Sequence, residues 1–151
     1  MSSIRFERCR PVRSRGAMMM RMDEHPNAAA YRRTAAAFRA QDMEALGALI
    51  DDEVVWHVPG TNAMSGDVRG REALLEWFRR LRKITDGTFT LQEHDVLGND
   101  EHVVALSLMG ATKGGAPVAV AVISVFHYRN GRQRERWFHP TDFEAWDTML
   151  S

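Results

Sequence analysis

The residues best suited to chemistry lie close together near the C-terminus. They are Glu135, Trp137, His139 and Asp142. Histidine titrates near neutral pH, and a neighbouring carboxylate holds its tautomer and raises its pKa. Such a pair can move a proton next to a carbonyl group, as aldol cyclisation or isomerisation requires. We therefore expect His139 to transfer the proton, with Asp142 or Glu135 to orient it. The alternative is a His-Pro corner in which Asp142 caps a terminal helix.

Aromatic and apolar residues elsewhere in the chain are candidates for the walls of a ligand pocket. Trp56 and Val58 share one face of a predicted strand, because side chains alternate along a strand. Together with Trp137, Phe126 and Tyr31 they are the candidate contacts of a ring-bearing or terpenoid-like ligand. The alternative is plain core packing, which is the role of most buried tryptophans. Asn62, in the loop that follows, is a candidate for the pocket mouth. His57 points away from Trp56, and its role stays open.

Metal and cofactor chemistry have no support in the sequence. The 6 histidines show no HxxxH or HxH spacing, and the single cysteine, Cys9, excludes a cysteine-rich zinc site. Neither common phosphate-binding glycine pattern occurs. We therefore predict neither a metal nor a cofactor.

One turn supplies the geometry of the C-terminal candidates. Asn130-Gly131 is the strongest two-residue hairpin signal, and such a turn fixes the register of its strands. A regular ladder from this turn places Phe126 opposite Glu135, and it puts Trp137 and His139 on the same face. A carboxylate beside an aromatic ring has a raised pKa and suits acid or base catalysis. Pairing of Glu135 with an arginine is the open alternative.

The elements that position these residues run in the order helices first, strands after. The first half of the chain predicts a helix with apolar residues from Ala28 to Met43, a short helix capped by Asp42, a strand at 54–58, a loop to Gly70 and a helix containing Leu74 to Leu81. The second half predicts strands at about 87–97, 101–113, 116–129 and 132–139, followed by a terminal helix from Thr141. This order predicts an α+β fold.

The strand at 116–129 is apolar on both faces, which suggests burial on both. The helices can cover one face, so we expect a second subunit on the other and hence a homodimer through the sheet. A monomer with a cupped sheet is the alternative.

Charge divides the chain into two parts. Residues 1–22 carry six arginines and one acidic residue, although the whole chain has a formal net charge of +0. We interpret 1–22 as a disordered tail or a misassigned start, and 23–151 as one domain. The acidic balance of the domain argues against a nucleic-acid partner, and the absence of a long apolar run argues against a membrane span. A cytoplasmic location is expected.

Several stretches together resemble the SnoaL-like branch of the superfamily that includes nuclear transport factor two and ketosteroid isomerase. They are Phe38-Arg-Ala-Gln-Asp-Met-Glu-Ala-Leu, Asp51-Asp-Glu-Val-Val-Trp-His-Val-Pro-Gly60, Gly66-Asp-Val-Arg-Gly-Arg-Glu-Ala-Leu74, Val125-Phe-His-Tyr-Arg-Asn-Gly131 and Glu135-Arg-Trp-Phe-His-Pro-Thr-Asp142. The resemblance runs from about residue 25 to the C-terminus. It implies a cone-shaped fold of the cystatin-like type, in which a curved antiparallel sheet wraps around helices and leaves an apolar pocket. It also implies dimers through the sheet.

The resemblance carries over only part of the known catalytic residues. Ketosteroid isomerases place a carboxylate base before a proline at the end of the first strand, where this chain has Val58 before Pro59. Their first-helix tyrosine falls within one turn of Tyr31. SnoaL-like cyclases use acid and base groups late in the chain, near the position of Glu135 and His139.

Two functions follow from these residues. The first is a small-molecule-binding protein that acts as a cofactor-free acid/base enzyme, either a cyclase, an isomerase or a dehydratase, on a hydrophobic oxygenated metabolite. The alternative is a non-catalytic ligand-binding or protein-interaction module on the same fold.

Overall fold

The computed structural model describes residues 24–151. Its elements are α1 (Pro26–Ala40), α2 (Met43–Ala48), β1 (Ile50–Val58), β2 (Gly66–Arg69), α3 (Arg71–Ile84), β3 (Thr90–Gly98), β4 (His102–Lys113), β5 (Ala116–Arg129), β6 (Arg132–Pro140) and α4 (Phe143–Met149). The segment interpreted as a tail, residues 1–22, lies outside the described residues. Within residues 24–151, no helix is long and apolar enough to cross a membrane.

Local sequence explains where the helices begin and end. Asp42 and Asp142 cap α2 and α4, each accepting a hydrogen bond from a backbone amide three residues later. Pro26 opens α1 at a position where its missing amide hydrogen costs nothing. Gln41 ends the same helix in the left-handed conformation, with φ of 56°.

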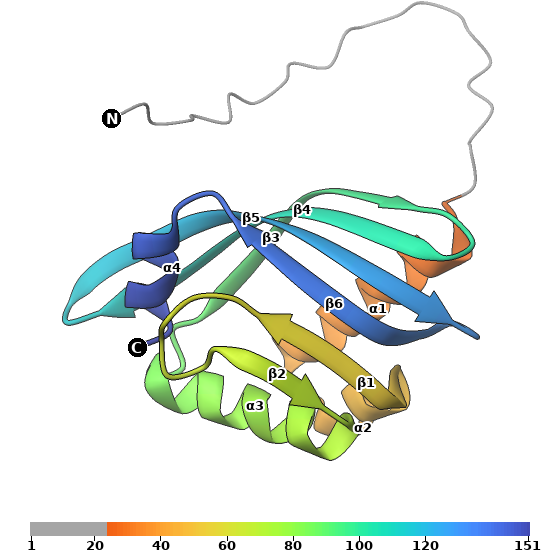
Figure 1. The fold of residues 1–151 in the computed structure, drawn as a ribbon, viewed down its shortest axis with the longest axis horizontal. Helices are drawn as coiled ribbons and strands as arrows, with labels where there is room; N and C mark the ends of the chain where they lie inside the picture. Colours follow the sequence, from red (N-terminus) through yellow and green to blue (C-terminus); the bar gives the residue numbers. More distant parts are fainter. Residues whose placement is uncertain (1–23) are drawn as a thin grey trace, which may run out of the picture.

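The strands form one curved sheet in the order β2-β1-β6-β5-β4-β3. Figure 1 shows this sheet passing over α1 and α3, with α4 at one end. The predicted α+β class, with a curved sheet around the helices, is confirmed. Two features differ from expectation: a short strand, β2, occupies part of the predicted loop, and β1 pairs with β6 in parallel.

The β5–β6 hairpin follows the predicted register only beside its turn. Arg129 is opposite Arg132 and Tyr128 is opposite Gln133, as expected. The ladder then shifts by one residue, so that His127 faces Glu135. The shift leaves Arg134 as an extra residue in β6, which is a β-bulge.

This bulge reverses the faces predicted for the rest of β6. Because side chains alternate along a strand, a one-residue shift moves each of them to the opposite side of the sheet. Phe126 is therefore opposite Arg136 and not Glu135, and Val125 is opposite Trp137. The expectation that Glu135, Trp137 and His139 share the face of Phe126 is wrong.

The inner face of the sheet and the helices enclose the hydrophobic core. A large cluster joins α2, α3 and α4 to the inner side of β1, β4, β5 and β6, and a smaller one joins α1 to β3, β4 and β5. Trp146 of α4 and Phe126 of β5 are each 1% exposed. The core thus surrounds the space between the sheet and the helices.

Candidate ligand cavity

A cavity opens inside the cone, between the inner face of the sheet and the helices. The empty space within its lining is about 550 Å³ when the open solvent at its mouth is included. Its lining consists of Tyr31, Thr34, Ala35, Phe38, Leu46, Trp56, Trp77, Phe78, Leu81, Phe89, Leu91, Met109, Phe126, Gln133, Arg136, Phe138, Trp146 and Leu150. Half of these side chains are aromatic. Such a wall suits a largely apolar ligand that contains rings.

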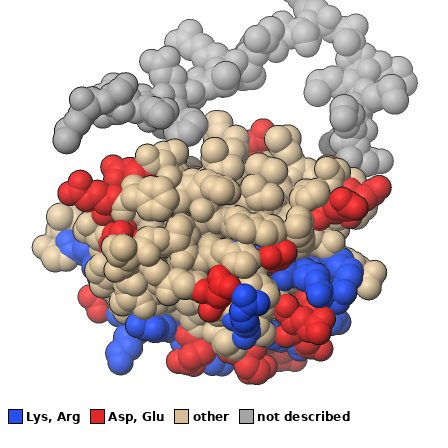
Figure 2. Space-filling view, viewed as in Figure 1, with Lys and Arg blue, Asp and Glu red and all other residues tan. Residues whose placement is uncertain are grey.

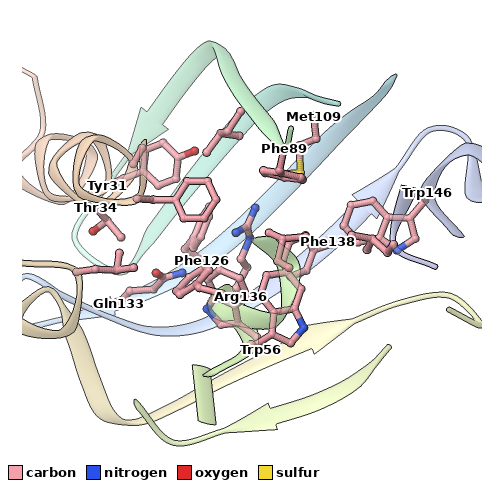
Figure 3. A pocket seen from close by; sticks show the side chains of 18 residues that line it. Tyr31, Thr34, Trp56, Phe89, Met109, Phe126, Gln133, Arg136, Phe138 and Trp146 are labelled. Atoms are coloured by element: carbon pink, nitrogen blue, oxygen red, sulfur yellow. The ribbon is translucent and has the colours of Figure 1, made fainter. Parts of the chain in front are cut away.

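The walls come from the helices α1, α2, α3 and α4 and from the inner face of the sheet (Figure 3). Tyr31 projects from α1 on one side, and Trp146 of α4 closes the other. Trp56 of β1 packs edge-on against its aromatic neighbours, with its ring centroid 5.2 Å from that of Phe78 and 5.3 Å from that of Phe138. Edge-on contacts of this kind fix ring orientations, so the walls are firmly held.

Among the residues of the 24–151 segment that line the cavity, Arg136 is the single charged one. Its side chain enters the cavity from β6, and the residue is 7% exposed. The guanidinium carbon lies 3.8 Å from the ring centroid of Phe138, 4.5 Å from that of Trp56 and 4.7 Å from that of Phe126. Nη2 donates a hydrogen bond of 2.9 Å to the hydroxyl of Ser124. The charge is therefore stabilised by cation–π contacts with three aromatic rings and by one hydrogen bond to a hydroxyl.

Burial lowers the pKa of Arg136 to about 10. Burial disfavours the charged form of a base, because a low-dielectric interior solvates an ion poorly. A pKa of about 10 still leaves the guanidinium protonated at neutral pH. Burial also raises the pKa of Tyr31 and that of Tyr128, so both hydroxyls are neutral at this pH.

Three nitrogen donors around the cavity have no acceptor among residues 24–151. They are Nε1 of Trp56, Nε2 of Gln133 and Nε of Arg136. A buried donor without an acceptor costs roughly 1–3 kcal/mol. All three would gain from a molecule that brings oxygen acceptors into the cavity.

A family model described as the SnoaL-like domain matches residues 31–136. The chain belongs to the SnoaL-like family. A similar solved structure is that of Bal32a, from a soil-derived mobile gene cassette. It is 36% identical, has a TM-score of 0.79, and the match covers 83% of this chain and 97% of that one.

Other proteins extend the comparison. The uncharacterized protein Rv0034 of Mycobacterium tuberculosis is 34% identical over 85 residues, which cover 56% of this chain and 65% of that protein. This chain thus spans less than two thirds of that curated relative. TerC, crystallised with polyporic acid, is 17% identical with a TM-score of 0.73, and the match covers 84% of this chain and all (100%) of that one. At that identity the likeness concerns the fold alone.

The structure places three of the predicted ligand-contacting residues of this SnoaL-like protein in the cavity wall: Tyr31, Trp56 and Phe126. Val58 is buried in the core beside it but does not line the space. Asn62 lies outside the lining as well. Its side-chain amide donates a 2.7 Å hydrogen bond to Asp147, and this bond ties the 59–65 loop to α4.

The predicted proton-transfer residues lie away from the cavity. Glu135, Trp137 and His139 project from the outer face of β6, because the bulge reverses that strand. His139 is exposed there. Asp142 is exposed at the start of α4, where its carboxylate accepts a hydrogen bond from the amide of Ala145. The helix-cap alternative is therefore confirmed for Asp142.

The outer residues form a polar network of their own. His57 bridges two carboxylates: Nδ1 lies 2.8 Å from Asp67 and Nε2 lies 2.8 Å from Glu135. Glu135 also contacts His127 at 3.2 Å, and Trp137 stacks on the ring of His57 with centroids 5.2 Å apart. Burial alone would lower the pKa of His57, but the bonds to Glu135 and Asp67 outweigh it and raise the pKa. These ionic contacts stabilise the outer sheet surface.

Sequence reasoning missed Arg136 and Phe138, which the bulge turns inward. It also missed Gln133 and Trp146 as cavity residues. The register beside the turn puts Gln133 on the inner face of the sheet, the face of Tyr128. Its burial, at 1% exposure, identifies it as a cavity residue only in the structure. No local signal marks Arg136, because Arg134 and Arg136 are equally charged and only the register distinguishes them.

Proposed function

We propose that this SnoaL-like protein binds an apolar, ring-bearing small molecule in the cavity inside its cone. The observation that carries the proposal is the lining itself, because half of its side chains are aromatic. TerC, which shares the fold, was crystallised with polyporic acid, and this supports a small-molecule ligand. Donors without acceptors in the wall favour a ligand with oxygen atoms.

A binding role fits the lining better than acid/base catalysis does. Among the described residues that line the cavity there is no carboxylate and no imidazole. General acid/base catalysis most often uses one of these groups, and the Tyr31 hydroxyl in the wall has a raised pKa, which disfavours it as a base. The non-catalytic alternative raised from the sequence is therefore the function that we put forward, in a protein that we expect to be cytoplasmic.

Filling the cavity from α1 tests this proposal. Ala35 is 4% exposed and lines the space, so Ala35→Leu is expected to occupy it and to weaken binding of a neutral aromatic probe, 2-naphthamide, by about tenfold or more. Isothermal titration calorimetry measures the affinity. Ala36→Leu is the matched control, because Ala36 is the next residue of the same helix and is exposed. Equal affinities for wild type and Ala35→Leu would contradict binding in this cavity.

We further propose that two copies of the chain associate through the outer face of the sheet. Leu108 is 41% exposed and Ile123 is 42% exposed on neighbouring strands of that face. Figure 2 shows charged side chains gathered toward the margins of this view, with a largely uncharged centre. Native mass spectrometry of the purified chain is expected to give a dimer that Ile123→Asp converts to a monomer. A monomeric wild type would contradict the proposal.

A further inference from the structure

The charge inside the cavity has no counter-charge in the described part of the chain. The ion pairs formed by residues 24–151 do not include Arg136. The ionisable side chains that act on its pKa are Tyr31 and Tyr128, whose own pKa values burial raises, so both are neutral at pH 7. A buried ion without a partner is unfavourable, and proteins ordinarily pair such groups. Arg136 is thus a buried cation that lacks an anion.

The arrangement around Arg136 leaves its in-plane donors for that anion. Three aromatic rings lie against the guanidinium, at 3.8 to 4.7 Å from its central carbon. Nη2 is used by Ser124, while Nε has no acceptor. Guanidinium donors are arranged as a planar fork that matches the two oxygens of a carboxylate. Figure 3 shows the group between Phe126 and Phe138, in the middle of the lining side chains.

A second observation comes from a pocket beside the cavity. This outer chamber shares Phe38, Phe78, Leu81, Phe89 and Leu91 with the inner cavity, so both spaces border these side chains. The remaining residues of its lining are Arg39, Gln41, Met43, Arg79, Arg82, Gly87 and Thr90.

Among the described residues, this outer lining contains three arginines and no acidic residue. Two of them are paired with carboxylates outside the lining, Arg39 with Glu93 and Arg79 with Glu76. Arg82 donates to the side chain of Gln41 and forms none of the ion pairs within residues 24–151. A cation of this kind raises the local concentration of anions, in agreement with the cation inside.

We propose that the ligand of the cavity is an aromatic or polycyclic anion whose ionised oxygen group, a carboxylate or an ionised enol or phenol, binds Arg136. This inference rests on the proposed function and adds the charge of the ligand to it. The rings of the ligand occupy the aromatic part of the cavity, and its oxygen atoms accept hydrogen bonds from the guanidinium. Trp56 and Gln133 supply further donors to the same oxygen-bearing ligand.

Two probes of nearly equal shape test the charge. The full chain is titrated by calorimetry with 2-naphthoate, a carboxylate, and with 2-naphthamide, its neutral counterpart. Wild type is expected to bind 2-naphthoate about tenfold or more tightly than 2-naphthamide, because hydrogen bonds to charged groups are the stronger ones. Arg136→Met is expected to remove this preference, because the cation that distinguishes the two probes is then absent. Arg136→Lys, which keeps a positive charge, is expected to retain part of the preference.

The outcomes separate this inference from the proposed function. If both probes bind wild type equally, and Ala35→Leu weakens both, the cavity binds ligands and the anionic class is overturned. A preference for 2-naphthoate that persists in Arg136→Met also overturns it. If neither probe binds wild type, the proposed function fails and the inference fails with it. Arg132→Met is the matched control, because Arg132 is exposed on the same strand.

Discussion

Arg136→Met is expected to raise the free energy of unfolding by about 1–2 kcal/mol while it abolishes the preference for an anionic probe. A pKa lowered from 12.5 to about 10 corresponds to a cost on the order of 3 kcal/mol for keeping the charge in the folded protein. The sign follows from linkage: the unfolded chain binds this proton more tightly, so the cost is fully present below pH 10. Replacing buried ions by apolar residues of similar size is often neutral or stabilising.

Lost contacts offset part of this gain. Arg136 lies over three aromatic rings, and a cation–π contact contributes roughly 0.5–2 kcal/mol. Methionine recovers some of it, because its sulfur also packs well against aromatic rings. The variant leaves the hydroxyl of Ser124, which is 0% exposed, without its donor. These opposing contributions set the expected net gain below the full cost of burying the charge.

Urea denaturation at pH 7 measures the difference between wild type and the variant. Arg132→Met serves as the control on the exposed part of the strand, where a substitution changes stability by less than about 0.5 kcal/mol. A loss of more than about 1 kcal/mol in Arg136→Met would show that the guanidinium is a structural element of the core. The unpaired charge of Arg136 would then not cost stability, and its cost would no longer support a role in ligand binding.

Trp146→Ala is expected to lower the free energy of unfolding by about 3–5 kcal/mol. Trp146 is 1% exposed, and its ring centroid lies 5.5 Å from that of Phe138. Its indole nitrogen donates a 2.9 Å hydrogen bond to the carbonyl of Pro59. A helix as short as α4 is unstable in isolation, so this side chain holds it against the sheet. The substitution also opens one end of the cavity.

Two further variants of α4 make the test specific. Phe143 belongs to the same helix but is 54% exposed, so Phe143→Ala is expected to change stability by less than about 0.5 kcal/mol. Trp146→Phe keeps most of the packing and loses the bond to Pro59, and its effect is expected to lie between the two. Denaturant midpoints of the three variants supply the comparison. A loss below about 1 kcal/mol in Trp146→Ala would mean that α4 does not close the cavity.

Much of the fold was predictable because its signals are local. Asp42 and Asp142 mark the starts of α2 and α4 through a single hydrogen bond to the backbone. Asn130-Gly131 marks the hairpin, because few residues accept the positive φ of a tight turn. Trp56, Phe126 and Tyr31 were expected near the ligand, and they line the cavity.

The candidate site was only partly predictable, because a β-bulge is set by distant contacts. The extra residue, Arg134, lies 3.1 Å from Glu53 and 3.6 Å from Asp51, which are far from it in the sequence. Nothing in the local pattern distinguishes a bulge here, since Trp137 and Phe138 are both large and apolar. Because of this one extra residue, Arg136 and not Glu135 points into the cone.

The amino-acid sequence alone thus determined the SnoaL-like family, the elements and the aromatic character of the pocket, since each depends on residue type and short-range spacing. Tertiary structure decided which charge faces the ligand. That choice depends on strand register, and the register is fixed only when β6 pairs with β1 and β5 at the same time. Because side chains alternate between the two faces of a strand, the one bulged residue turns the cationic side chain of Arg136 into the cavity.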